Sequence, residues 1–208
     1  GADYRLRWFT PTVEVPLCGH ATLASAAAVM ERLETGRDAV VFHTASGPLT
    51  VTRSGGRYVM DFPARPCAQV EAPPGLAAAL GAEPEEVVWD GFNYLARLGA
   101  PQAVRDLAPD LAAIGRLDCA GVIVTARDGA EWDFVSRYFA PAKGIPEDPV
   151  TGGAHCALTP FWAQRLGKLD FRAHQASARG GELVCRLKGD RVELEGACVF
   201  YLEGEATF

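Results

Sequence analysis

The amino-acid sequence contains no run of eighteen apolar residues, and its N-terminus has no basic stretch followed by an apolar one. The first absence excludes a membrane-spanning helix from these residues and the second a signal peptide, so we expect a cytoplasmic protein. Positive charge is also scarce, because 20 Lys and Arg residues stand against 26 Asp and Glu residues. A net charge of −6 has the wrong sign for a nucleic-acid or anionic-membrane partner, which leaves a small molecule or a protein.

Paired cysteines are absent as well. The six cysteines stand singly, without a Cys-x-x-Cys motif, so the sequence predicts neither a metal site nor a disulfide framework. We expect most of their thiols to be buried. The six residues are Cys18, Cys67, Cys119, Cys156, Cys185 and Cys198. What the chain does have is 208 residues of which 49% are apolar, enough for the core of one large or two small domains.

An internal repeat organises the chain. Two motifs and a turn recur in the same order, at an offset of 130 residues for the first and 133 for the others. The matched segments are Arg7–Pro11 with Arg137–Pro141, Glu14–Ala21 with Glu147–Ala154, and Thr44–Gly47 with Ser177–Gly180. Chance rarely gives several matches in one order at nearly one spacing, so we infer two equivalent halves.

Each copy has the pattern of a strand, a loop, a helix and a strand hairpin. The expected elements are Tyr4–Phe9, Gly19–Leu33, Leu49–Arg53 and Tyr58–Phe62 in the first copy, and Phe134–Phe139, Gly153–Leu166, Glu182–Leu187 and Arg191–Leu194 in the second. The first helix carries small or apolar residues on every face, which is typical of burial inside a curled sheet. Between the copies we expect a helix at Pro101–Ile114 and a buried strand at Ala120–Ala126.

These patterns predict an α+β fold of two pseudo-symmetric lobes, each a mostly antiparallel or mixed sheet wrapped round a central helix. We place the N-terminal lobe at residues 1–88, the C-terminal lobe at 89–195, and a C-terminal strand at 196–208 that returns to the N-terminal lobe. About 45 structured residues precede the first motif of the second copy, and only six precede that of the first. We therefore expect the first lobe to lack its opening strands, which leaves either an exposed sheet edge or a gap that a neighbour's segment fills.

Glycine stands where each repeated helix is expected to begin, at Gly19 and Gly152. A helix start presents unpaired N–H groups and the positive end of the helix dipole, so two facing starts would bind a carboxylate. The plainer alternative is that both are turn glycines. Their equivalent positions in the repeat favour the carboxylate site.

Acid/base candidates cluster at the same two junctions. His20 lies in the first helical turn, where the dipole disfavours the imidazolium, so we expect a neutral imidazole that exchanges protons; a structural histidine is the alternative. Asp148 has no acidic counterpart in the first half, so we take it as functional rather than as a helix cap. Glu147 matches Glu14, and we take it and His155 as structural.

Cys18 stands one residue before the first expected helix, a position that activates an exposed thiol. Its counterpart in the second half is Thr151. A racemase with one thiol on each face of a stereocentre would need cysteine at both positions, so that mechanism is excluded. We expect Cys18 to be a buried thiol.

At these motifs the chain resembles the phenazine-biosynthesis PhzF-like isomerase family. The resemblance runs through Arg7–Pro11, Glu14–Ala24 and Gly144–Cys156, with support from Gln175–Gly181 and Gly204–Phe208. It implies the diaminopimelate-epimerase-like fold, with the site in a cleft between two lobes. It also implies a homodimer.

The resemblance further implies isomerisation by proton transfer without a cofactor or metal, as family members do with dihydro-hydroxyanthranilate. His20 and Asp148 fall on the family's catalytic His and Asp. We expect the substrate to be a small carboxylate, including cyclic amino-acid-like molecules, with binding contacts at Cys18, Gly19, Thr151, Gly152 and Gly153.

Two departures from the family leave alternatives open. Gly153 replaces a serine whose hydroxyl contacts the substrate, and no Glu-Thr-Ala-Phe-like motif with the family's general acid/base Glu precedes Arg7. One alternative is a catalytically impaired binding or interaction protein of the same fold. Another is a single-thiol epimerase or dehydratase that uses Cys18 with Thr151.

Overall fold

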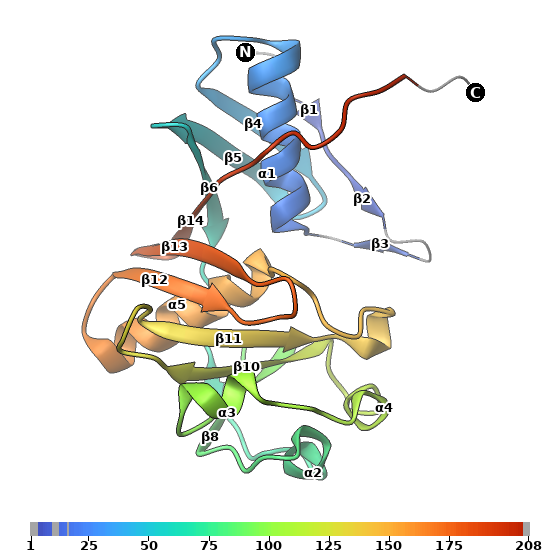
Figure 1. Ribbon diagram of the computed structural model, residues 1–208, viewed down its shortest axis with the longest axis vertical. Helices are drawn as coiled ribbons and strands as arrows, with labels where there is room; N and C mark the ends of the chain where they lie inside the picture. The colour runs from blue at the N-terminus through green and yellow to red at the C-terminus, as the bar shows by residue number, and fades with distance from the viewer. Residues whose placement is uncertain (1–3, 10–12, 16, 206–208) are drawn as a thin grey trace.

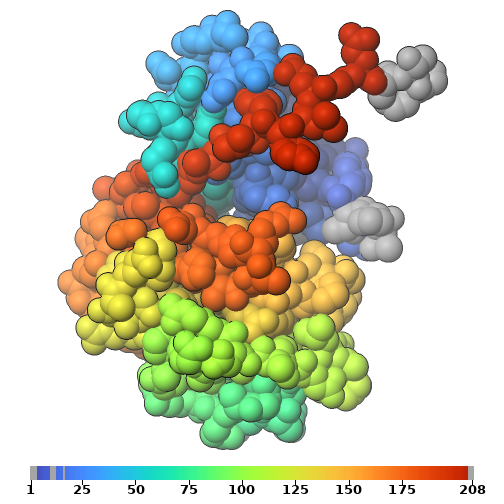
Figure 2. Space-filling view, viewed as in Figure 1, coloured from blue at the N-terminus to red at the C-terminus, as the bar shows by residue number. Residues whose placement is uncertain are grey.

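The computed structural model describes residues 4–9, 13–15 and 17–205. Two lobes lie one above the other along the long axis, with the blue and cyan part of the chain in the upper lobe (Figures 1 and 2). Pro11, the last residue of the first repeated motif, lies outside the described residues, as do residues 206–208 of the expected C-terminal strand.

One mixed sheet of twelve strands runs through both lobes. The first eight in spatial order are β1 (Tyr4–Arg5), β4 (Ala39–Thr44), β5 (Gly47–Ser54), β6 (Arg57–Pro63), β14 (Arg191–Gly196), β13 (Gly181–Lys188), β12 (Asp170–Gln175) and β11 (Phe134–Phe139). β1 is parallel to β4 and β11 to β12, and the other neighbours in this set are antiparallel. The series of parallel and antiparallel pairings is therefore the same whether it is followed from β1 or from β11. The four strands of each lobe are arranged alike, which confirms the two-lobe α+β architecture.

The central pair of strands, β6 and β14, joins the lobes. Met60 lies opposite Leu194 in this ladder, and Leu194 is fully buried. Side chains from both lobes share one apolar cluster, which includes Met30, Phe42, Phe62, Phe134, Trp162 and Phe171. Removing this shared surface from water holds the lobes against each other. The residue boundaries that we place at 88/89 and 195/196 stay predictions.

One long helix lies in each lobe. α1 (Gly19–Ala28) continues into a π-helical turn, η1 (Val29–Leu33), and packs against the strands of the upper lobe (Figure 1). α5 (Gly152–Leu166) packs against the lower strands and ends at Gly167, whose φ of +62° is the left-handed conformation expected of a helix stop.

One backbone hydrogen bond of α5 is not formed at Pro160, because proline has no N–H to donate to the carbonyl of Cys156 four residues earlier. The freed carbonyl accepts the N–H of Arg65 at 2.9 Å. Arg65 lies in the segment that leaves β6, so this bond ties that segment to α5.

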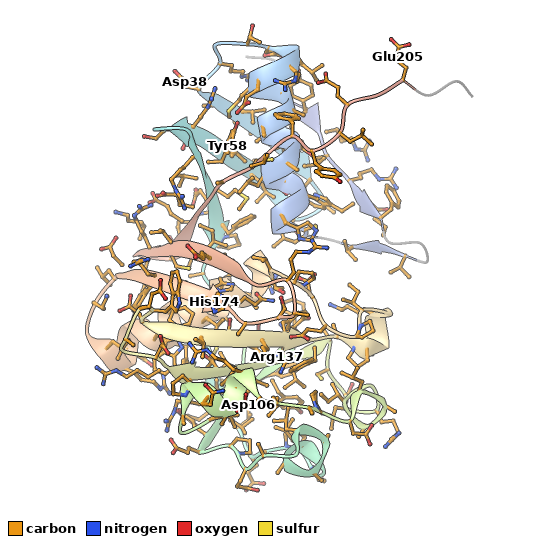
Figure 3. The ribbon with its side chains drawn as sticks, viewed as in Figure 1. Asp38, Tyr58, Asp106, Arg137, His174 and Glu205 are labelled. Carbon is orange, nitrogen blue, oxygen red and sulfur yellow. The ribbon has the colours of Figure 1, made fainter. Side chains whose placement is uncertain are left out.

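Matching ion pairs show the repeat in three dimensions. Arg7 donates two hydrogen bonds to the Glu14 carboxylate, at 2.9 and 2.8 Å. Arg137, which Figure 3 labels, donates two to the Glu147 carboxylate, at 2.7 and 2.9 Å. Each pair holds the loop that leads to its helix, which confirms the structural role expected for Glu147.

The first expected strand, Tyr4–Phe9, is divided. Its start forms β1, and its end forms β2 (Trp8–Phe9), which pairs with β3 (Glu14–Val15) in a separate two-stranded sheet. β1 lies at one edge of the large sheet. At the other end four strands continue beyond β11, namely β10 (Gly121–Arg127), β9 (Asn93–Arg97), β8 (Glu86–Trp89) and β7 (Ala68–Gln69).

Short helices surround these outer strands. They are α2 (Leu76–Leu80), α3 (Pro101–Arg105), α4 (Leu111–Ile114) and the 3-10 turn η2 (Pro141–Lys143). The single helix expected at 101–114 is wrong, because Pro109 disfavours helical backbone at the residue before it. Asp110 then starts α4 by accepting the Ala113 N–H at 2.9 Å.

The described part of the C-terminal segment, residues 197–205, crosses in front of α1 without forming a strand (Figure 1). The strand expected at 196–208 is therefore not formed there. The Arg32 guanidinium lies 4.0 Å from the ring centre of Phe200, which places this segment against the N-terminal lobe. Within the described residues, no helix has the length and apolar character needed to cross a membrane.

Candidate functional site

The starts of α1 and α5 meet where the two lobes join. A Cβ placed on Gly19 would lie 3.2 Å from the Cα of Gly152, and one placed on Gly152 would lie 3.3 Å from the Cα of Gly19. Both distances are tighter than ordinary contact, so a side chain at either position needs the facing backbone to give way by a few tenths of an ångström. Glycine therefore serves the close approach of the two helices here rather than a turn.

Neither helix start is capped by the side chain of its N-cap residue, Cys18 or Thr151. The Thr151 hydroxyl donates to the Asp148 carboxylate instead, at 2.5 Å. Within the described residues no side chain accepts the first-turn N–H groups of either helix, and the positive ends of the two helices meet at one place. Such a junction suits an anion.

His20 lies on the exposed face of α1, and its Nε2 atom is 3.5 Å from the Sγ atom of Cys18. The contact with Cys18 raises the pKa of His20 against the effect of burial, and the Asp148 carboxylate and the Val150 backbone add to the rise. These contacts favour the imidazolium form of His20. The helix dipole, on which we based the expectation of a neutral imidazole, acts in the opposite direction.

Cys18 is half-buried, so the expectation of a buried thiol is wrong for it. All six cysteines are free thiols, and only Cys156 and Cys185 are fully buried, which also corrects our expectation for the set. Burial raises the pKa of these two thiols to about 12. Cys18 differs in its setting, because its sulfur faces an imidazole.

His155 occupies the position in α5 that Thr22 occupies in α1. The Thr22 hydroxyl donates to the Cys18 carbonyl at 2.6 Å, and Nδ1 of His155 lies 2.8 Å from the Thr151 carbonyl. Both side chains therefore support the residue before their helix. Burial lowers the pKa of His155 to about 4, so it stays neutral, in keeping with the structural role expected for it.

The backbone bond between Arg65 and α5 brings the Arg65 side chain to the start of that helix. Its Nη1 atom lies 3.8 Å from where a Cβ on Gly153 would be. The guanidinium packs on the ring of Phe92, 4.9 Å from its centre, and forms no ion pair with a carboxylate of the described residues. The Arg65 cation thus stands beside Gly153, where the resemblance implies a hydroxyl.

A cavity of about 480 Å³ opens beside the helix starts, between α1, the strands β13 and β14, and the C-terminal segment. Figure 2 shows the opening beneath the red segment. Gly19, His20 and Gly152 line this cavity, together with Ala24. His20 and Ala24 are exposed to it, so the expected burial of α1 on every face is wrong on this side.

Four of the predicted site residues do not line this cavity, namely Cys18, Asp148, Thr151 and Gly153. Asp148 acts on His20 through its charge. Among the described residues no three His, Cys, Asp or Glu side chains group as metal ligands.

Sequence reasoning missed Arg65 and Gln175 as members of the site. Gln175 is fully buried, and its amide holds the Asp148–Thr151 loop. It was visible only as the first residue of a supporting motif, Gln175–Gly181. Nothing in the sequence around Arg65 indicates that it reaches α5.

The fold and the junction of helix starts define the class of protein. A hydroxyproline epimerase from Agrobacterium vitis with bound trans-4-hydroxy-L-proline shares the fold, with a TM-score of 0.60 at 13% identity over 92% of this chain and 67% of that one. A phenazine biosynthesis protein of the PhzF family from Enterococcus faecalis has a TM-score of 0.94 at 40% identity, over 100% of this chain and 80% of its own. The protein therefore has the fold of two-lobed isomerases and epimerases.

Sequence comparison gives the particular family. A profile of the phenazine biosynthesis-like protein family, PhzC-PhzF, matches residues 1–204. An uncharacterized isomerase of Pseudomonas aeruginosa is 51% identical over 204 residues, which cover 98% of this chain and 78% of that protein. The chain belongs to the phenazine biosynthesis-like family, as its motifs predict.

We predict that Gly19→Ala and Gly152→Ala each lower the free energy of unfolding by about 1–3 kcal/mol, because the added methyl group meets backbone atoms that cannot move independently. Thermal or urea unfolding measures the change. Gly153→Ala is the matched control, because the nearest atom to its new Cβ is 3.8 Å away. It should keep or raise stability, by up to about 1 kcal/mol. Equal losses for the three variants would contradict the close approach of the helices.

Proposed function

We propose that this protein is an isomerase that transfers a proton within a small carboxylate substrate, without a cofactor, in the cleft between its lobes. The observation that carries this proposal is the meeting of two uncapped helix starts beside His20 and Asp148. Membership of the family supports the reaction class. The trans-4-hydroxy-L-proline bound to the hydroxyproline epimerase supports cyclic amino acids as the first substrates to test.

The helix starts and Arg65 supply the binding of the substrate carboxylate. The N–H groups at Gly19 and Gly152 donate from two directions, and the positive helix ends favour the charged form of the ligand. The Arg65 guanidinium, beside the start of α5, adds a full positive charge to that of the helix ends. Held in this way, the substrate presents its acidic C–H bond to fixed side chains, which lowers the entropic part of the barrier.

His20 and Asp148 supply the proton transfer. The raised pKa of His20 keeps a larger share of imidazolium near neutral pH, so this residue can donate a proton as well as accept one. The Asp148 carboxylate, which accepts the Thr151 hydroxyl, acts on His20 through its charge. The resemblance assigns a further acid/base role to a Glu in a motif that these 208 residues do not contain.

Two other proposals remain distinct from this one. The contact between Cys18 and His20 favours a single-thiol epimerase or dehydratase that uses Cys18 with Thr151. A binding protein without turnover is the other. We also propose a homodimer, on the resemblance alone.

We predict that these 208 residues incorporate deuterium from heavy water into a carboxylate substrate, in a reaction that formate accelerates by supplying the acid/base group that the resemblance assigns to a Glu they do not contain. Proton NMR of anthranilate-like and proline-like substrates measures the loss of the C–H signal. His20→Asn and Asp148→Asn should each slow the exchange about 100-fold or more.

The same assay separates the alternatives. Exchange that is fast without formate and survives His20→Asn would contradict the mechanism. Exchange that is lost in Cys18→Ser but kept in His20→Asn would favour the single-thiol enzyme. Carboxylate binding without exchange at any formate concentration would identify a binding protein.

We predict that Arg65→Met weakens the binding of anthranilate about tenfold, the effect of losing one hydrogen bond between charged groups. Isothermal titration measures both affinities. Anthranilamide, which has the same ring but no negative charge, is the control ligand and should be unaffected by the substitution. An equal loss for both ligands would show that Arg65 shapes the pocket rather than binds the carboxylate.

A further inference from the structure

Gln175 is the last residue of β12, and its side chain is fully buried beside the start of α5. Its Oε1 atom accepts the backbone N–H of Thr151 at 2.7 Å. Its Nε2 atom donates to the carbonyl of Asp148 at 2.7 Å and to the hydroxyl oxygen of Thr151 at 3.1 Å. One amide group thus holds three polar groups of the loop that leads into the helix.

The two backbone partners determine which way the amide points. A backbone N–H can only donate and a carbonyl can only accept, so Oε1 faces Thr151 and Nε2 faces Asp148. Exchanging the two ends would set donor against donor and acceptor against acceptor. Because the site is buried, the groups left without partners would cost much more than the bonds themselves.

This orientation also sets the direction of the Thr151 hydroxyl. The hydroxyl oxygen accepts a hydrogen from Gln175, so its single proton is free to point at the Asp148 carboxylate, 2.5 Å away. A hydrogen bond to an ionised carboxylate is strong and holds the group in one orientation. The orientation matters because this carboxylate helps to raise the pKa of His20.

We propose that Gln175 is a positioning residue of the site: it directs the Thr151 hydroxyl and thereby orients the Asp148 carboxylate toward His20. Gln175 also occupies the N–H of Thr151. The N–H groups that remain for a substrate carboxylate are therefore those of α5 itself. The role of Gln175 in catalysis rests on the proposed function. Its hydrogen bonds to the loop and their effect on Asp148 do not.

Other charged groups near His20 are independent of Gln175. Cys18 contacts the imidazole directly. The cavity that His20 lines receives titratable or charged side chains from β6, β13, β14 and the C-terminal segment, at Arg57, Glu182, Glu195 and Cys198. In the described structure none of these side chains is hydrogen-bonded to Gln175. A change at Gln175 should therefore reach His20 through the loop that Gln175 holds, by the Asp148 carboxylate and by the Val150 backbone, and the Thr151 variants isolate the part due to Asp148.

The test is the pKa of His20, followed by NMR of its ring proton during a pH titration without substrate. Asp148→Asn removes the carboxylate charge and should lower the pKa of His20 by about 0.5 or more. Gln175→Met keeps the length of the side chain but removes its hydrogen bonds, so it should produce part of that decrease. Thr151→Val should act in the same direction, and Thr151→Ser, which keeps the hydroxyl, should restore the original value.

Ser177→Ala is the matched control. The Ser177 hydroxyl donates to the carbonyl of Pro149 at 2.9 Å, so it supports the same loop without touching Asp148. This variant should lower the melting temperature and leave the pKa of His20 unchanged.

An unchanged pKa in Gln175→Met, or an equal decrease in Ser177→Ala, would overturn the proposal and leave Gln175 a purely structural residue. If Gln175→Met does not fold, the comparison of Thr151→Val with Thr151→Ser decides in the same way. An unchanged pKa in Asp148→Asn would overturn the proposal as well. None of these results depends on turnover, so a failure of the proposed function would be seen separately in the exchange assay.

Discussion

The contact between two helix starts, at Gly19 and Gly152, is the constraint on which the rest of the structure depends. Each start carries roughly half a positive charge, so bringing the two together is electrostatically unfavourable without an anion between or beside them. The β6–β14 ladder and the apolar cluster shared by both lobes hold the starts in place. The fold thus maintains a positively charged junction, which a ligand carboxylate would complement in the function that we propose.

The pseudo-symmetry of the chain separates its scaffold from its chemistry. Both halves keep an arginine–glutamate pair that holds the loop before the helix, and both support the N-cap carbonyl from the first helical turn. The halves differ where a substrate would react. The first contributes a thiol and an imidazole, whereas the second contributes a carboxylate with a hydroxyl that orients it. A substrate between them would meet different groups on its two faces.

Much of this arrangement could be predicted from the sequence, because the repeat links positions 130 to 133 residues apart. Repeated motifs identified the two helix starts and the matching Arg and Glu residues. Local patterns failed where one residue outweighs the periodicity, as Pro109 does in dividing the helix expected at 101–114. The expectation that Cys18 is buried was also wrong, because the exposure of a residue just before a helix depends on tertiary packing that the local pattern does not contain.

Arg65 and Gln175 could not be assigned from sequence for a different reason. Arg65 reaches α5 because Pro160 frees a carbonyl in that helix, a bond between residues nearly one hundred positions apart. Gln175 acts through backbone groups of a loop that strand pairing brings to it. In both cases the partners are set by tertiary structure, and residue type alone says nothing about them.

The central claim is that both helix starts bind one carboxylate. The most direct measurement is a titration of the isotopically labelled protein with anthranilate, followed through its backbone amide NMR signals. We predict that the amides of Gly19, His20, Gly152 and Gly153 shift together with one affinity, and that anthranilamide does not move them. Shifts confined to one helix start, or equal shifts with the uncharged amide, would contradict it.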